Sequence, residues 1–216
     1  MVHFSTGAKA ISVIDYGLGN VQAFANLYSR LGFNVVVAKT AADIANARCL
    51  VMPGVGSFDW AMGRLNSSGM RESLDKMVLD VGVPVLGVCV GMQIMADYSA
   101  EGVSPGLGWI SGGVRAFEIP DNGDMVSQRL PVPHMGWNAV KPAKEDGLFA
   151  GLAESHFYFL HSYFFDALDT SNSLAFSNYL VPFVSAINRD NIYGVQFHPE
   201  KSHSGGVRLL QNFASL

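Results

Sequence analysis

The chain has 216 residues, of which 49% are hydrophobic and 15% are charged, and it contains only 23 glycines and 9 prolines. This composition excludes a disordered or low-complexity protein, and the length suits a single domain, residues 1–216. The formal net charge of −4 argues against a nucleic-acid binder, which needs a dense basic surface.

Short apolar runs alternate with helical patterns in the first part of the chain. Strands are expected at 10–14, 35–37, 49–52 and 84–88, with the third broken by Pro53-Gly54. Helices are expected at 21–31, 40–47 and 70–79, and Thr40 with Asp43 predicts a capping box for the second of these. Apolar strands separated by helices indicate a parallel sheet that is covered on both faces.

From residue 107 onward the pattern changes to short β-like runs with turn residues between them. These runs lie at 108–118, 136–140, 157–160, 174–178, 183–187 and 192–197, and a helix is expected at 206–214. We interpret them as an antiparallel extension or a smaller second sheet. The predicted fold class is therefore α/β, with a mostly parallel central sheet flanked by helices and a smaller antiparallel β portion in the second half.

The sequence contains few features that indicate a membrane span, a signal peptide or disulfide bonds. No stretch is long and apolar enough to predict a membrane span, and residues 1–9 lack the apolar core of a signal peptide. Two cysteines, Cys49 and Cys89, cannot form a disulfide framework, and reduced thiols are the simpler interpretation. We expect a soluble cytoplasmic protein that binds no membrane.

A nucleophile is predicted in Gly87-Val88-Cys89-Val90-Gly91, at the end of the fourth expected strand. A sharp strand-to-helix turn needs small neighbours and holds its central side chain at the carboxyl edge of the sheet. The helix that follows favours a thiolate there. The alternative is a structural cysteine between two packing glycines; the flanking strand and helix favour the nucleophile. Cys49, inside an apolar run, is interpreted as a core residue.

A base for Cys89 is predicted at His198, in the segment GVQFHPE. The residue before a proline is extended, and residues two apart in extended chain share a side, so Glu200 can orient His198. His203 makes a metal site with His198 and Glu200 conceivable, but no further ligand supports it. We expect no metal and no cofactor.

Two glycine-rich segments carry weaker signals. In Met52–Phe58 (MPGVGSF), glycines can aim backbone N–H groups at an oxyanion, or they can simply form a tight turn. The segment Asp15–Asn20 (DYGLGN) resembles the start of a dinucleotide fingerprint, but Gln22 stands where its third glycine belongs. A nicotinamide site is therefore not expected.

Several of these segments, in this order along the chain, resemble one family. PGVGSF, GVCVGMQ and GVQFHPEKS are similar to the triad-type (class I) glutamine amidotransferases. DYGLGN, PHMGWN and FLHSY resemble, within that family, the glutaminase subunits of imidazole glycerol phosphate synthase. The resemblance covers nearly the whole chain.

The resemblance implies a mechanism. Cys89 attacks the side-chain amide of L-glutamine and forms a glutamyl thioester, His198 passes a proton to the leaving ammonia, and Glu200 orients His198. Water then releases glutamate. The implied oxyanion hole consists of the backbone of Gly54, Val55 and Gly56 and the N–H of Val90.

The resemblance also implies roles in binding. Gln93 and Glu101 hold the substrate glutamine, with Glu101 at its ammonium group, and the backbone of Ser162 and Tyr163 grips its carboxylate. His134 and Trp137 belong to the face that meets a partner, although a packed hairpin residue and a core aromatic are equally good interpretations of these two.

The implied partner is a (β/α)8-barrel cyclase subunit, which forms a heterodimer with the glutaminase and uses its ammonia to make imidazole glycerol phosphate and AICAR in histidine biosynthesis. Val90 replaces the usual leucine, and SHSGG follows HPEK. Chains of this kind include relatives that supply ammonia for an amidino group on a bacterial surface sugar, so the acceptor stays open. A stand-alone cysteine hydrolase is a further alternative.

Overall fold

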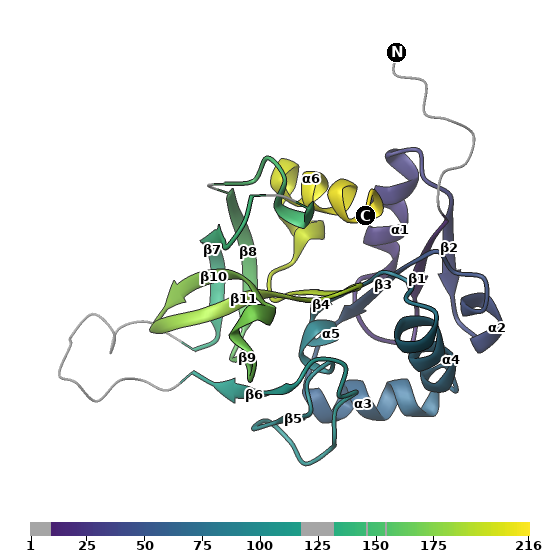
Figure 1. The fold of residues 1–216 in the computed structure, drawn as a ribbon, viewed down its shortest axis with the longest axis horizontal. Helices are drawn as coiled ribbons and strands as arrows, with labels where there is room; N and C mark the ends of the chain where they lie inside the picture. Colours follow the sequence, from purple (N-terminus) through teal and green to yellow (C-terminus); the bar gives the residue numbers. More distant parts are fainter. Residues whose placement is uncertain (1–9, 118–131, 146, 154) are drawn as a thin grey trace.

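A computed structural model describes residues 10–117, 132–145, 147–153 and 155–216 (Figure 1). The polar segment 1–9 and the last residue of the β-like run 108–118 lie outside the described residues. No described helix has both the length and the apolar character needed to cross a membrane.

Five parallel strands form one half of the sheet, with β2 at its edge. In spatial order they are β2 (Val35–Ala38), β1 (Ile11–Ile14), β3 (Cys49–Gly54), β4 (Val85–Cys89) and β12 (Ile192–Val195). All residues of β1, β3 and β4 are buried, as expected for a sheet covered on both faces. The four strands predicted in the first part of the chain are confirmed.

Two details of the strand predictions are wrong. The strand β3 is not broken at Pro53-Gly54, because these two residues pair with Val88 and Cys89 of β4. The pairing of β3 with β1 ends at Val51, so the missing N–H of Pro53 loses no hydrogen bond on that side. The run at 192–197 is not part of the antiparallel portion alone, because β12 pairs in parallel with β4.

The antiparallel strands continue the same sheet and do not form a separate one. From β12 the order runs through β11 (Val181–Arg189), β10 (Ser173–Tyr179), β7 (His134–Pro142) and β8 (Ser155–His161). The strands β9 (Tyr163–Ala167), β6 (Gly112–Ala116) and β5 (Tyr98–Ser99) branch from β11. Figure 1 shows this half beside the parallel half, and β9 is a strand that the sequence patterns did not predict.

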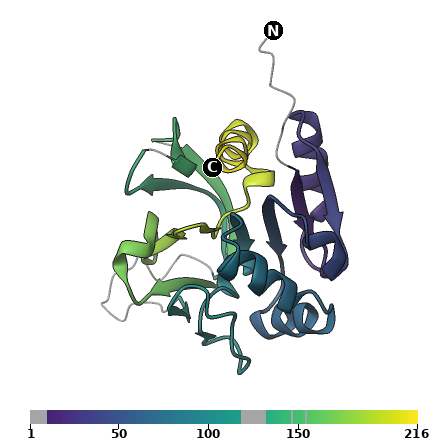
Figure 2. The same ribbon diagram turned by 45° about the vertical axis from the view of Figure 1, so that its right-hand side comes forward.

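Helices cover both faces of the parallel strands (Figures 1 and 2). On one face lie α1 (Val21–Arg30) and α6 (His203–Ala214), joined where the Tyr28 hydroxyl donates to the Leu210 carbonyl at 3.2 Å. On the other lie α3 (Phe58–Ser67), α4 (Arg71–Asp75) with its π-helical continuation η1 (Lys76–Asp80), and α5 (Val90–Gln93). The short α2 (Ala41–Ile44) carries the predicted capping box between Thr40 and Asp43.

The helix α3 was not predicted, although a local signal for it exists. Its buried residues are Phe58, Ala61, Met62 and Leu65, which repeat at helical spacing. This helix starts at Phe58, the last residue of the glycine-rich segment MPGVGSF, so its first turn lies at the carboxyl edge of the parallel strands.

Candidate active site

Cys89 occupies a strained turn between β4 and α5, with φ 56° and ψ −116°. The glycines around it allow two segments of backbone to touch. A Cβ atom on Gly91 would collide with the Met52 carbonyl oxygen of β3, and one on Gly54 would collide with the backbone of Gly91. A Cβ on Gly87 would lie 2.5 Å from the Gly91 carbonyl oxygen. These contacts explain the residue pattern around the turn and fix Cys89 at the carboxyl edge of the sheet.

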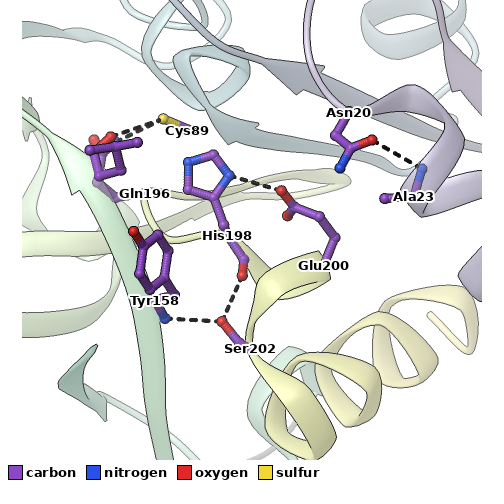
Figure 3. Close-up of polar contacts among 9 residues, drawn as sticks. Asn20, Ala23, Cys89, Tyr158, Gln196, His198, Glu200 and Ser202 are labelled. Atoms are coloured by element: carbon purple, nitrogen blue, oxygen red, sulfur yellow. Dashed lines mark hydrogen bonds and ion pairs between the residues drawn. The ribbon is translucent and has the colours of Figure 1, made fainter. Parts of the chain in front are cut away.

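His198 follows β12 and is held by its backbone against β8. Its N–H donates to the Tyr158 carbonyl at 2.8 Å. The Ser202 hydroxyl donates to the His198 carbonyl at 2.6 Å and accepts the Tyr158 N–H at 3.0 Å (Figure 3). Ser202 therefore positions His198 between two strands. The sequence patterns did not single out this serine, because its partner on β8 lies 44 residues away.

Cys89, His198 and Glu200 lie together (Figure 3), and Glu200 lies beside His198 as their two-residue spacing predicted. His198 Nδ1 lies 3.0 Å from Glu200 Oε1, and both side chains are 3% exposed. Burial lowers the pKa of His198, but its hydrogen bonds to Cys89 and Glu200, together with their negative charges, outweigh burial and raise it to about 9. At neutral pH the imidazole is therefore a cation between a sulfur and a carboxylate, which suits a general acid beside a nucleophile.

A pocket of about 240 Å³ opens over the Cys89 sulfur. The predicted residues that line it are Val55, Gly56, Cys89, Val90, Gln93, Glu101, Ser162, Tyr163 and His198. Of the other two residues predicted near it, Gly54 ends β3 beside Gly91, and Glu200 bonds His198. Pro133, Leu160, His161 and Lys201 also line the pocket and were not predicted there.

Gln93 is buried, and both hydrogens of its side-chain amide are engaged. Its Nε2 donates to the Tyr163 carbonyl at 2.9 Å and to Gln196 Oε1 at 3.0 Å. Its side-chain oxygen is therefore the atom that can accept a hydrogen bond from a ligand in the pocket. The Tyr163 carbonyl also accepts from His161 Nδ1 at 2.8 Å, so two side chains hold this part of the pocket wall.

The first turn of α3 holds the loop that carries Glu101. Glu101 Oε2 accepts the Phe58 N–H at 2.8 Å. The two carboxylate oxygens of Asp59 accept the N–H groups of Val103 and Ser104, each at 3.0 Å. These hydrogen bonds lower the pKa of Asp59 from its ordinary value, because they favour the charged carboxylate. Glu101 is thus fixed at the pocket rim by a helix that directly follows the glycine-rich loop.

The two residues predicted to meet a partner differ in exposure. Trp137 is 48% exposed, and its ring stacks on His203 with centroids 5.1 Å apart. His134 is only 3% exposed and lies stacked on Phe159 and Tyr179. The Trp137 ring is therefore partly exposed to solvent, whereas the His134 ring packs inside.

His134 instead joins a buried chain of hydrogen bonds that leads to the pocket. Its Nδ1 lies 3.0 Å from His161 Nε2, and His161 Nδ1 faces the Tyr163 carbonyl. Burial lowers the pKa of His134 to about 4 and that of His161 to about 3, so both rings are neutral at physiological pH. Because a carbonyl only accepts, His161 must donate through Nδ1 and accept from His134 through Nε2.

A metal centre is not assembled in the part of the chain that the structure describes. There, no group of three or more histidine, cysteine, aspartate or glutamate side chains is arranged to hold a metal ion. His203, the third member of the conceivable metal set, packs its ring on Trp137.

A family model, relatives in sequence and solved structures all relate this chain to glutamine amidotransferases. Residues 12–215 match the family described as Glutamine amidotransferase class-I. The imidazole glycerol phosphate synthase subunit HisH of Bdellovibrio bacteriovorus is 55% identical over 207 residues, which cover 95% of this chain and 100% of that protein. The HisH subunit of Leptospira interrogans is 47% identical over the same shares of both chains. The crystal structure of a glutamine amidotransferase shares the fold, with a TM-score of 0.71 and 17% identity over 95% of this chain and 99% of that one.

Proposed function

This chain belongs to the class-I glutamine amidotransferase family, and we propose that it is the glutaminase subunit of an imidazole glycerol phosphate synthase. One structural observation carries the proposal: Cys89, His198 and Glu200 are aligned beneath a pocket whose other walls hold Gln93 and Glu101. Relatives named as that synthase subunit match this chain over nearly its whole length and theirs.

In the proposed reaction the Cys89 sulfur attacks the side-chain amide carbon of L-glutamine. The His198 imidazolium, oriented by Glu200, gives its proton to the leaving ammonia. His198 then takes a proton from the water that attacks the glutamyl thioester. The carbon–sulfur bond breaks, glutamate leaves, and Cys89 and His198 return to the thiolate and imidazolium forms in which they began.

The remaining pocket residues have proposed binding roles. The backbone N–H groups of Gly54, Val55, Gly56 and Val90 would stabilise the oxyanion, since they belong to the segments that end β3 and begin α5. Glu101 would bind the substrate ammonium group and the oxygen of Gln93 would accept from the substrate. The backbone of Ser162 and Tyr163 would meet the substrate carboxylate.

The proposed partner is a (β/α)8-barrel cyclase subunit, in a cytoplasmic heterodimer. Exposed apolar side chains support a docking face on β7, where Met135 is 66% and Trp137 48% exposed. A surface hollow beside them is lined by Asn138, Asn178 and Leu180 among others. Aromatic and methionine side chains are enriched at the centres of protein interfaces.

The test is glutamate release by the purified chain, alone and mixed with the histidine-pathway cyclase subunit and its nucleotide substrate. We expect strong stimulation when both are present. Glutaminase activity that ignores this cyclase would contradict the assignment to the synthase and favour the surface-sugar acceptor. Equal hydrolysis of unrelated amides without any partner would favour a stand-alone hydrolase.

Asp59→Asn tests how the Glu101 loop is held. An amide in place of the carboxylate weakens the bonds from Val103 and Ser104, so Glu101 loses its fixed position. We expect KM for glutamine to rise about tenfold and kcat to change less than about threefold, because this contact acts on substrate binding. Steady-state kinetics of the stimulated complex measure both, and Glu72→Gln, on the exposed surface of α4, is the matched control. A change in kcat with KM unaltered would contradict this role.

A further inference from the structure

The sulfur of Cys89 has a polar neighbour that the proposed mechanism does not use. The side chain of Gln196 is fully buried, at 0% exposure, and its Nε2 lies 3.8 Å from Cys89 Sγ (Figure 3). A buried amide is unfavourable unless its polar atoms are hydrogen-bonded. Gln196 directly follows the last residue of β12 and stands two residues before His198, so the segment that leaves this strand brings two polar groups to one sulfur.

The surrounding hydrogen bonds determine which end of the Gln196 amide faces the sulfur. The Tyr163 carbonyl can only accept, so Gln93 must meet it with Nε2. The second hydrogen of that Nε2 points at Gln196, 3.0 Å away, and Gln196 must accept it through Oε1. The Nε2 of Gln196 is then the end that meets Cys89. The orientation of both amides therefore follows from a backbone carbonyl.

We propose that Gln196 is a catalytic residue that donates an N–H hydrogen bond to the Cys89 sulfur and stabilises its thiolate, and that Gln93 and the Tyr163 carbonyl hold it in that orientation. A hydrogen bond from a neutral amide is stronger to an anion than to a neutral thiol, so this contact favours the reactive form of the cysteine. The place of Gln196 in catalysis rests on the proposed glutaminase function.

This arrangement gives Gln93 a second task. Gln93 lines the substrate pocket and orients Gln196, so one side chain connects the substrate to the nucleophile. Its two hydrogens are used inside the protein, which leaves the oxygen for the substrate. A substitution of Gln93 is thus expected to change both substrate binding and the reactivity of Cys89.

Other titratable groups also face the sulfur, and a test must hold them constant. His198 is hydrogen-bonded to it, and Tyr16, in the turn after β1, is near enough for its charge to interact with that of Cys89. Glu101 and Lys201 line the same pocket. None of the Gln196 variants below alters these four groups, so a changed pH profile reports on Gln196.

The experiment measures alkylation of Cys89 by iodoacetamide in the full chain as a function of pH, with the modified cysteine identified by mass spectrometry. Gln196→Met keeps a flexible side chain of similar length, and Gln196→Leu removes the amide as well. We expect the pH of half-maximal alkylation to rise by about one unit in both, so that alkylation on the acidic side of the profile is about tenfold slower. Cys49, which is 1% exposed, is the internal reference for unfolding.

Ser185→Ala is the matched control. Ser185 is fully buried on β11, and its carbonyl accepts the Gln196 N–H at 2.9 Å, but its side chain is no part of the network. We expect its alkylation profile to equal that of the unmodified chain. Folded Gln196 variants with an unchanged profile would overturn the proposal. If neither Gln196 variant folds, Gln93→Met tests the proposal in the same assay. It removes the hydrogen bond that orients Gln196, so the Gln196 amide can turn away from the sulfur.

The alkylation assay and the glutamate-release assay test the two proposals separately. An unmodified chain that releases no glutamate from glutamine, with or without the cyclase, would contradict the glutaminase proposal. The alkylation profiles compare variants without any substrate, so their result stands in either case.

Discussion

Replacing Cys89 by alanine is expected to abolish glutamine hydrolysis, leaving less than about one thousandth of the normal turnover. The reason is that the sulfur forms the covalent intermediate of the proposed reaction, and the described residues that line the pocket include no second cysteine. Binding of the partner should persist, because Cys89 is 4% exposed and lies at the end of β4 inside the pocket. Glutamate release and complex formation, measured on the same preparation, check both statements.

The control for this prediction is Cys49→Ala. Cys49 begins β3, at the opposite end of that strand from Gly54, and it is 1% exposed. Its replacement is expected to lower the melting temperature slightly, since it removes a buried sulfur, and to leave hydrolysis within about threefold of normal. Residual turnover above about one thousandth in Cys89→Ala would refute the cysteine as nucleophile.

Glu200→Gln is expected to lower turnover on the order of a thousandfold, less than Cys89→Ala does. Glu200 Oε1 accepts the hydrogen on His198 Nδ1 at 3.0 Å, and its negative charge helps to raise the pKa of His198 to about 9. A neutral amide holds the ring less well and no longer stabilises the cation. The pKa of His198 should therefore fall.

The direction of the pH effect follows from the proposed role of His198 as proton donor. A lower pKa means that the imidazolium is lost at lower pH, so the alkaline limb of kcat/KM should move toward neutral pH in Glu200→Gln. A pH series of initial rates measures this shift, and Glu72→Gln, an exposed carboxylate on α4, should leave the profile in place. An alkaline limb that stays where it was would show that Glu200 does not act through His198.

Local sequence patterns were sufficient to predict part of the geometry of the site. The glycines around Cys89 are visible in the sequence because the turn needs them within two residues on each side. The pair His198 and Glu200 is equally local, since two residues of extended chain place both on one side. Thr40 and Asp43 form their capping box from neighbours three residues apart.

Local sequence patterns could not predict the contacts between segments that are distant in the sequence. The bond from Ser202 to Tyr158 joins residues 44 apart, and that from Gln196 to Cys89 joins residues 107 apart. The interior position of His134 depends on Phe159 and Tyr179, which flank it from other strands. The parallel pairing of β12 with β4 likewise arises only when the chain returns to the sheet after the antiparallel strands.

The sequence by itself therefore determined the α/β class, the strained cysteine turn, the His198–Glu200 pair and, through resemblance, the family. Tertiary structure decided which of the remaining polar residues reach the sulfur and which are buried elsewhere. The physical reason is that backbone strain, capping and strand alternation act within a few residues. Hydrogen-bond partners of a buried side chain, by contrast, are set by whichever segments the sheet brings beside it.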